Sequence, residues 1–405
     1  MPGRSIRNIN QLRVLEALRA SPGLSRTELV RDTGLGKATV SELVREFIGK
    51  GLVREDAAAP EESSVGRRRI KLELSGSNWL AVGVELTGAH CISVVCDLHG
   101  RPLRSLITPL RGTTVEGAQR TLVEAVGEVL ADFGPAHVVG VGVGVPGVVD
   151  STRRRVVLAE NLGWRYVPLA DNVEPSLPSA VFLINRNRAG ALAEYWYGAN
   201  KGNRSLVYVS LGLGVGCGIM IGGLLYEGAS GAAGEIGHIV VDPGGRRCKC
   251  GHKGCLETVA GGPAVARRAR EALRARGGRS VIAELVSKRL SQITPGLVYE
   301  AAMSGDELAN DVLAESAKYL GTAFAAVANL LNPAVIVIDA GFGEISQGFI
   351  DHVYEGMSSN AFPASQSTTT ICGSTLGHQA GAIGAAIVAI DEFVLQGKLE
   401  SALSS

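Results

Sequence analysis

The chain has 405 residues, of which 46% are hydrophobic and 20% charged, and its formal net charge is +1. These values are typical of a globular protein of two or three domains and exclude a disordered chain. Seven cysteines are too few for a disulfide framework. No apolar run has the length or position of a signal peptide or a membrane span, so we expect a cytoplasmic protein without membrane contact.

Charge is distributed unevenly along the chain. Residues 1–72 hold 14 Lys and Arg against 9 Asp and Glu, while the remainder holds 26 against 30. A basic head on a mildly acidic body predicts an anionic partner for the head only.

Two short helices are predicted at the start of this head. The segment 9–20 is expected to be helical, with an apolar stripe of Leu12, Leu15 and Leu18, and Ser-Pro-Gly stops it. Ser25 and Glu28 then form a capping box that opens a second helix to about Thr33.

A third helix is predicted from about Lys37, after a Gly-Leu-Gly turn. Its apolar stripe has helical spacing and consists of Val40, Leu43, Val44, Phe47 and Ile48. The polar and cationic residues that the stripe leaves outside suit phosphates and base edges in a DNA major groove: Lys37, Thr39, Ser41, Glu42 and Arg45.

A wing is predicted after the third helix. Segments 51–56 and 68–74 have the pattern of two strands, separated by a small polar loop. The arginines at the returning base of the wing are suited to a DNA minor groove: Arg67, Arg68 and Arg69. Residues 1–75 are therefore predicted to be a winged helix-turn-helix DNA-binding domain. The alternative is a three-helix interaction module whose charges are only solvated.

From residue 76 the pattern is that of an α/β body. Glycine-rich, β-branched strands alternate with helical stretches expected at 115–133, 187–198, 262–276, 306–331 and 376–395. The length suffices for two lobes, which we place at 76–195, completed by the helix at 376–395, and at 196–375.

Two glycine clusters in the body resemble nucleotide-binding loops. Gly142, Gly144 and Gly147 spell GxGxxG, but Pro146 interrupts them and "VVD" follows instead of a helix, so we interpret the match as accidental. The cluster at 211–218 lacks the Lys-Ser/Thr of a P-loop. It is predicted to turn a hairpin tightly or to bring the backbone near a ligand.

Three of the seven cysteines fall within eight positions, with a histidine upstream. The spacing His238-x9-Cys248-x-Cys250-x4-Cys255, with glycines between, fits a closed tetrahedral zinc site of structural type. His252 competes as the fourth ligand, and a cluster of merely buried cysteines is the simpler alternative.

Several motifs of the body together resemble the ROK family (repressors, open reading frames and kinases). They are "GAAGEIGHIVVDPGGRRCKCGHKGCLE" (231–257), "LGLGVGCGIMIGGLLYEGASG" (211–231), "VPGVVD" (145–150), "NLGW" (161–164) and "NLLNPAVIVI" (329–338). The resemblance implies a two-lobed, actin-like sugar-kinase fold, to which the xylose- and N-acetylglucosamine-type repressors of the family add a DNA-binding head.

The resemblance also implies site residues. His238 would bind zinc and touch a sugar, and Glu235 and Glu257 would accept hydrogen bonds from sugar hydroxyls. This is the reason for preferring His238 over His252 as a zinc ligand. A purely structural role for the two glutamates in positioning the zinc loop is the alternative.

Two departures from the kinases of the family stand out. Their catalytic aspartate follows an asparagine, but here Asn185 is followed by Arg186, which cannot accept a proton near neutral pH. Their Gly-Gly-Thr phosphate loop is replaced by "VELTGAH" (84–90), without paired glycines. Phosphoryl transfer needs both parts, so we expect no kinase activity.

We expect one of three arrangements for the Arg186 side chain. It pairs with Glu235 or Glu257 and plugs the pocket, it points away from a neutral-sugar site, or it meets an anionic group of a sugar phosphate or sugar acid.

The sequence thus predicts a sugar-responsive transcriptional regulator, most simply a repressor. We expect it to bind an inverted-repeat operator as a homodimer or homotetramer. The alternatives are an active sugar kinase with a DNA-binding head, and a regulator whose cleft no longer binds sugar.

Overall fold

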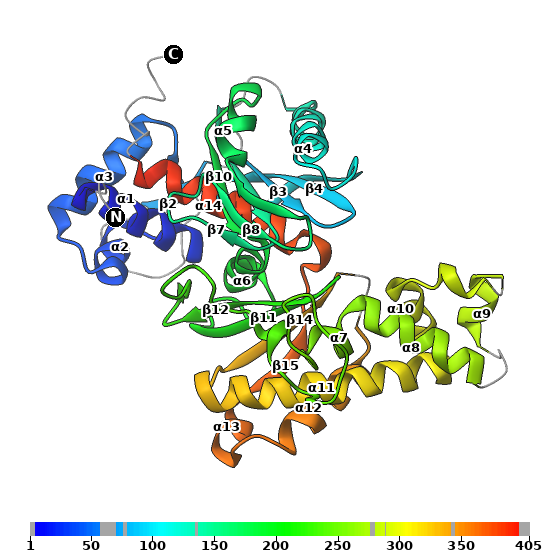
Figure 1. Cartoon of the computed structure of the whole chain (residues 1–405). Helices are drawn as coiled ribbons and strands as arrows, with labels where there is room; N and C mark the ends of the chain where they lie inside the picture. The colour runs from blue at the N-terminus through cyan, green and yellow to red at the C-terminus, as the bar shows by residue number, and fades with distance from the viewer. Residues whose placement is uncertain are drawn as a thin grey trace. The chain divides into compact units, whose positions relative to one another are not determined.

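A computed structural model describes residues 5–56, 70–75, 79–133, 137–275, 280–287, 289–341 and 345–396. The chain forms two compact units, Met1–Ala189 with Gly381–Ser405, and Gly190–Ala380. Their mixed α/β structure, with a helical head at the N-terminus, confirms the expected fold class (Figure 1). The boundary between the units falls inside a helix, at Ala189, and the head belongs to the first unit. The three-part division of the sequence stays a prediction.

The head contains the predicted three helices and two strands. Its elements are α1 (Ile6–Ala20), α2 (Arg26–Thr33), α3 (Lys37–Gly49), β1 (Val53–Asp56) and β2 (Lys71–Leu74), and the two strands pair antiparallel. Ser25 and Glu28 form the capping box, and Gly34 ends α2 with a positive φ of 69°. Arg67, Arg68 and Arg69 lie outside the described residues.

The buried stripe of α1 differs from the expected one. Leu15 and Leu18 are buried, but Leu12 is only half-buried, and Val14 takes its place in the core. The same helix buries two polar residues, Gln11 and Arg19. The leucine spacing did not predict their burial, because α1 also packs against the C-terminal helix of the chain.

A five-stranded sheet forms the centre of the first unit. Its order is β10 (Val181–Asn185), β6 (His137–Val145), β3 (Trp79–Leu86), β4 (His90–Asp97) and β5 (Pro102–Pro109). The pairs among β10, β6 and β3 are parallel, and those among β3, β4 and β5 are antiparallel. The remaining elements of this unit are a small sheet of β7 (Val148–Val149), β8 (Val156–Ala159) and β9 (Trp164–Val167), and the helices α4 (Val115–Leu130), α5 (Leu169–Val173), η1 (Glu174–Ser176) and α14 (Ala380–Leu395).

The second unit repeats this topology. Its sheet has the order β13 (Leu224–Leu225), β12 (Val215–Ile221), β11 (Ser205–Leu211), β14 (Val335–Ala340) and β15 (Thr370–Gly373), with the same parallel and antiparallel pairs. Helix α6 (Arg186–Tyr197) crosses the unit boundary. The other helices are η2 (Ile236–His238), α7 (Glu257–Ala260), α8 (Gly262–Ala275), α9 (Val281–Leu285), η3 (Leu290–Gln292), α10 (Pro295–Met303), α11 (Glu307–Leu331), α12 (Gln347–Ser358), α13 (Pro363–Thr368) and η4 (Gly377–Gln379).

The two glycine clusters have structural roles in these sheets. The 211–218 cluster turns the β11–β12 hairpin, in which Leu211 pairs with Val215. This confirms the first of its two expected roles. Gly142 and Gly144 lie inside β6, and strand β7 follows them rather than a helix. The GxGxxG match is therefore no dinucleotide-binding turn.

Helix α14 packs on the first sheet at very short range. A Cβ added at Gly83 of β3 or Gly142 of β6 would overlap the carbonyl oxygen of Ala382 or Ala385 in α14. Side chains alternate along a strand, so α14 lies on the face of β3 opposite to Val82 and Val84, which pack with α4 (Figure 1). Among the described helices, Gly377–Leu395 is apolar and long enough to cross a membrane, but 83% of its 18-residue apolar window is buried in the fold.

This packing generates a stability prediction. Gly142→Ala should lower the free energy of unfolding by about 2 to 3 kcal/mol, because α14 must move away from the sheet to admit a methyl group. The control is Gly127→Ala on the exposed side of α4, where an added Cβ meets no atom within 4 Å. It should stabilise the protein by about 0.5 to 1 kcal/mol. Urea unfolding measures both, and equal effects of the two substitutions would contradict the packing argument.

Candidate functional site

The exposed face of α3 carries the residues predicted to meet DNA. Lys37 and Arg45 are exposed, and Thr39 and Ser41 are half-buried. The apolar stripe beneath them is buried except for Ile48, which is half-buried. Glu42 is exposed, but its carboxylate accepts a hydrogen bond from Arg7 of α1 at 3.1 Å. α3 therefore presents two cations that form no ion pair within the described part of the chain, two hydroxyls, and a glutamate that is paired with Arg7.

The predicted zinc ligands lie together in the second unit. The ligand atoms of His238, Cys248, Cys250 and Cys255 all lie within 4.8 Å of one another. Cys248 Sγ is 3.6 Å from His238 Nδ1, and Cys250 Sγ is 3.6 Å from Cys255 Sγ. Four ligands bound at about 2.0 to 2.3 Å around a tetrahedral ion lie about 3.3 to 3.8 Å apart. The donor set and its spacing therefore fit such an ion.

The loop reaches this geometry through local backbone features. Gly251 and Gly254 have φ values of 98° and 72°, which side chains rarely adopt, and a Cβ at Gly254 would overlap the carbonyl oxygen of Asp242. The amide of Cys248 donates to the carbonyl of His252 at 2.7 Å, which closes the turn between the cysteines. His252 Nδ1 lies 3.5 Å from Cys250 Sγ, but the group of four includes His238 in its place.

The carboxylates predicted to receive sugar hydroxyls border this cluster. Glu257 Oε1 accepts a hydrogen bond from Cys248 Sγ at 2.8 Å and lies 3.9 Å from His238 Nδ1. Glu235 Oε2 lies 4.0 Å from His238 Nε2. Burial and then the hydrogen bond to Glu257 raise the pKa of Cys248, whereas hydrogen bonds with His252 lower the pKa of Cys250 to about 6. The structure thus brings together the three residues of this unit that were expected to bind a sugar, Glu235, His238 and Glu257.

The other expected ligand residues lie in the first unit, where β10 ends and α6 begins. Asn185 donates from Nδ2 to the carbonyl of Gly147 at 2.7 Å. Its Oδ1 accepts from the amides of Asn187 and Arg188 at 2.9 and 3.2 Å. Asn185 therefore caps α6 and ties it to the "VPGVVD" turn.

Arg186 has a partner that sequence reasoning missed. Its Nε lies 3.0 Å from Glu85 Oε1 at the end of β3, and both side chains are largely buried. The expected partners were Glu235 and Glu257. The signal was present in "WLAVGVEL", because a single carboxylate in a buried strand requires a nearby donor or cation.

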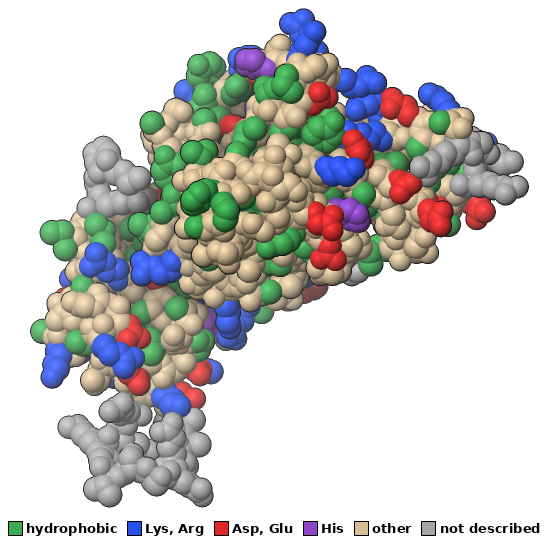
Figure 2. Space-filling model, turned by 90° about the horizontal axis from the view of Figure 1, so that it is seen from below, with side chains coloured by type: hydrophobic (Ala, Val, Ile, Leu, Met, Phe, Trp, Pro, Cys, Tyr) green, Lys and Arg blue, Asp and Glu red, His purple; other side chains and the backbone are tan. Residues whose placement is uncertain are grey.

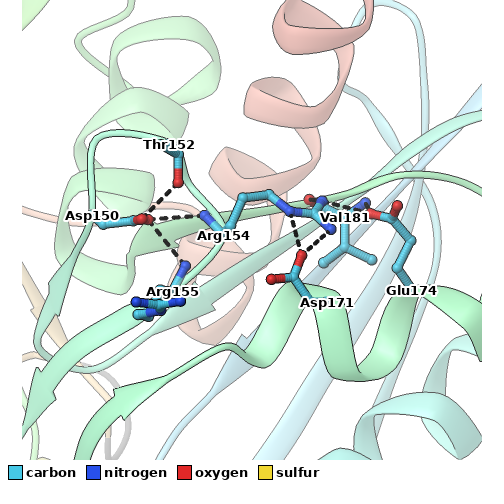
Figure 3. A network of polar contacts seen from close by, with 7 residues as sticks. All are labelled: Asp150, Thr152, Arg154, Arg155, Asp171, Glu174 and Val181. Atoms are coloured by element: carbon cyan, nitrogen blue, oxygen red, sulfur yellow. Dashed lines mark hydrogen bonds and ion pairs between the residues drawn. The ribbon is translucent and has the colours of Figure 1, made fainter.

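The turn after β7 is held by a polar network that the sequence did not reveal (Figure 3). Asp150 accepts hydrogen bonds from Thr152 Oγ1 and from the amides of Arg154 and Arg155. Burial alone would raise the pKa of Asp150, but these hydrogen bonds lower it. The Arg154 guanidinium binds Asp171 and Glu174. Asp150 is therefore occupied in shaping the turn.

Comparisons with known proteins agree with these features. Residues 81–392 match the ROK family, and residues 7–68 match the MarR family. The xylose repressor of Caldicellulosiruptor bescii is 29% identical over 89% of this chain and 90% of its own length. A crystal structure of a ROK family transcriptional regulator, described as a homologue of the Escherichia coli MLC protein, superposes with a TM-score of 0.82 at 27% identity, covering 98% of each chain.

A kinase of known structure is also similar. The ROK family glucokinase from Streptomyces griseus, crystallised with glucose and AMPPNP, superposes with a TM-score of 0.71 at 31% identity. The match covers 76% of this chain and 98% of the kinase. The motifs of the body, the His/Cys cluster and the winged head all agree with the family match, and the chain belongs to the ROK family.

Proposed function

We propose that the protein is a cytoplasmic transcriptional repressor of carbohydrate metabolism genes, whose ROK body binds a sugar or sugar derivative. The observation that carries the proposal is the union of a MarR-type winged head with a ROK body, over the whole length of a known regulator of this family. The similarity to the xylose repressor covers 89% of this chain and 90% of that protein. The cationic face of α3 supplies the surface that an operator requires.

We further propose that the body has lost kinase activity. The position after Asn185 holds a guanidinium, and that guanidinium is already bound by Glu85 at 3.0 Å. It has no proton-accepting atom, so it cannot act as a general base on a sugar hydroxyl. The alternative, an active kinase with a DNA-binding head, is favoured by the similarity of the body to glucokinases. A regulator whose cleft no longer binds sugar is the third candidate.

The His/Cys cluster is proposed to bind one structural zinc ion. Three thiolates and one imidazole fill a tetrahedral shell and leave no position for water, which is typical of structural sites. The ion would hold the loop that carries Glu235 and Glu257 beside it. A fixed loop orients these carboxylates toward the same ligand.

A homodimer or homotetramer is proposed as the operator-binding form, because two heads related by a twofold axis match an inverted repeat. The second unit exposes Leu330 at 83% and Phe362 at 66% on neighbouring segments, joined by the hydrogen bond from the Phe362 amide to Asn329. Figure 2 shows the molecule from below, which is the side where α13 lies in Figure 1. Hydrophobic side chains are exposed in this view among mainly uncharged surface. This face is a candidate for the subunit contact.

The first test of the proposed function concerns DNA binding. Arg45→Ala should weaken operator binding about tenfold, because an exposed cation on the reading face of α3 is lost. The control is Arg31→Ala on α2, whose guanidinium is bound by Asp32 at 2.8 Å and whose loss should change the affinity little. Fluorescence anisotropy at several salt concentrations, with DNA recovered by genome-wide mapping of bound sites, measures both. Equal affinities of the Arg45 variant and the wild type would show that α3 is not the reader.

The second prediction concerns the metal. Protein purified without chelator should contain one zinc per chain by elemental analysis, and Cys250→Ser should lower this content and the thermal stability. Cys372→Ser, a substitution of a half-buried cysteine outside the cluster, should keep the zinc. A stable wild-type protein free of metal would refute the zinc proposal.

The third prediction concerns catalysis and ligand. The wild type should consume no ATP with a panel of hexoses in a coupled assay. Calorimetry with glucose, glucose 6-phosphate and a uronic acid should detect a gain of glucose binding in Arg186→Asp combined with Glu85→Gln. The second substitution prevents repulsion between two carboxylates at the site. Glucose-dependent ATP consumption by the wild type would establish the kinase alternative instead.

A further inference from the structure

Arg19 of the head is a cation with a completely buried side chain. Its Nη2 lies 3.0 Å from Asp391 Oδ1 on the last turn of α14. Asn8, which lies on the same helix α1, donates from Nδ2 to the carbonyl of Leu395 at 2.8 Å. Burial and the neighbouring Asp391 carboxylate raise the pKa of Glu16 to about 7, although the Arg19 cation acts in the opposite direction. The head therefore docks on the C-terminal end of α14 through a buried ion pair.

Glu392, the residue after Asp391 in α14, contacts a turn that is hydrogen-bonded to the strand leading to the predicted ligand site. Glu392 Oε1 lies 3.1 Å from Arg153 Nε, and Arg153 is held with a positive φ of 58°. The carbonyl of Arg153 accepts a hydrogen bond from the amide of Leu183 at 2.8 Å. Leu183 lies in β10, two residues before Asn185. The last turn of α14 is thus bound both to the head and to the strand that ends at the predicted site.

The opposite end of α14 lies directly beside Glu85. A Cβ at Gly381 would overlap Glu85 Oε2, the carboxylate that binds Arg186. The two ends of this 16-residue helix are about 24 Å apart. α14 therefore spans the distance from the Glu85–Arg186 pair to the head.

Helix α14 packs against its neighbours through backbone contacts. The sheet contacts the backbone of α14 at two glycines, Gly83 and Gly142. α14 in turn contacts α6 at Gly384, which lies against the carbonyl of Ala189. Contacts between backbones have no side chains that adjust by changing rotamer, so a displacement at one end is passed on rather than absorbed. The glycine packing and the ion pairs together provide a continuous mechanical connection.

We propose that α14 couples the ligand site to the DNA-binding head, with the Arg19–Asp391 ion pair as the joint between them. The inference rests on the proposed function, since it names the path by which a ligand at that site regulates operator binding. Each ligand must bind two states of this element differently for coupling to occur. A change in the Glu85–Arg186 pair shifts α14, and the shift changes how the head is held.

A double-mutant cycle tests this path without a known ligand. Glu85→Gln perturbs the site, Asp391→Asn loosens the joint, and the readout is the Kd for a DNA fragment selected by the wild type from a random-sequence pool. Glu85→Gln should change this Kd at least about fivefold in the wild-type background, in either direction, and less than about twofold in the Asp391→Asn background.

The matched control is Asp132→Asn, which breaks the ion pair between this exposed aspartate and Arg104 in the same unit. In that background Glu85→Gln should keep its full effect. If Asp391→Asn does not fold, as judged by circular dichroism, Glu392→Gln replaces it and should likewise reduce the effect. Equal effects in the wild-type and loosened backgrounds, or no effect of Glu85→Gln at all, would overturn the proposal. A wild type that selects no DNA would instead refute the proposed function.

Discussion

Backbone contact between α14 and the first sheet is the constraint on which much of the first unit depends. Gly83, Gly142 and Gly384 remove the side chains that normally separate a helix from its neighbours. The helix is thereby fixed in height and register above β3 and β6. Its first turn comes to lie beside Glu85 and its last turn beside Arg19, so one packing arrangement positions both the predicted ligand site and the head.

The Glu85–Arg186 pair joins the end of β3 to the start of α6 inside the first unit. A buried carboxylate is costly unless a cation or donors approach it, and Arg186 is the cation that the described structure supplies for Glu85. The pair neutralises the end of β3 and the start of α6 together. The guanidinium offers no lone pair that could accept a proton at the position after Asn185.

The His/Cys loop works on a different principle, because its shape is local. Glycines with positive φ and hydrogen bonds within the loop bring four ligand atoms to distances that suit one ion. Glu257 contacts the cluster through Cys248, and Glu235 lies beside His238. A ligand that uses these carboxylates therefore meets side chains whose positions depend on the integrity of the loop.

The sequence by itself determined the features whose causes are local. The capping box of Ser25 and Glu28, the apolar stripe of α3 and the cysteine spacing of the loop each act within a few residues, so their patterns predicted them. Only the tertiary structure decided that Arg186 pairs with Glu85 and that Arg19 is buried against Asp391, 372 residues away. Charge pairing inside a fold depends on which strands and helices become neighbours, and hydrophobic periodicity carries no information about that choice.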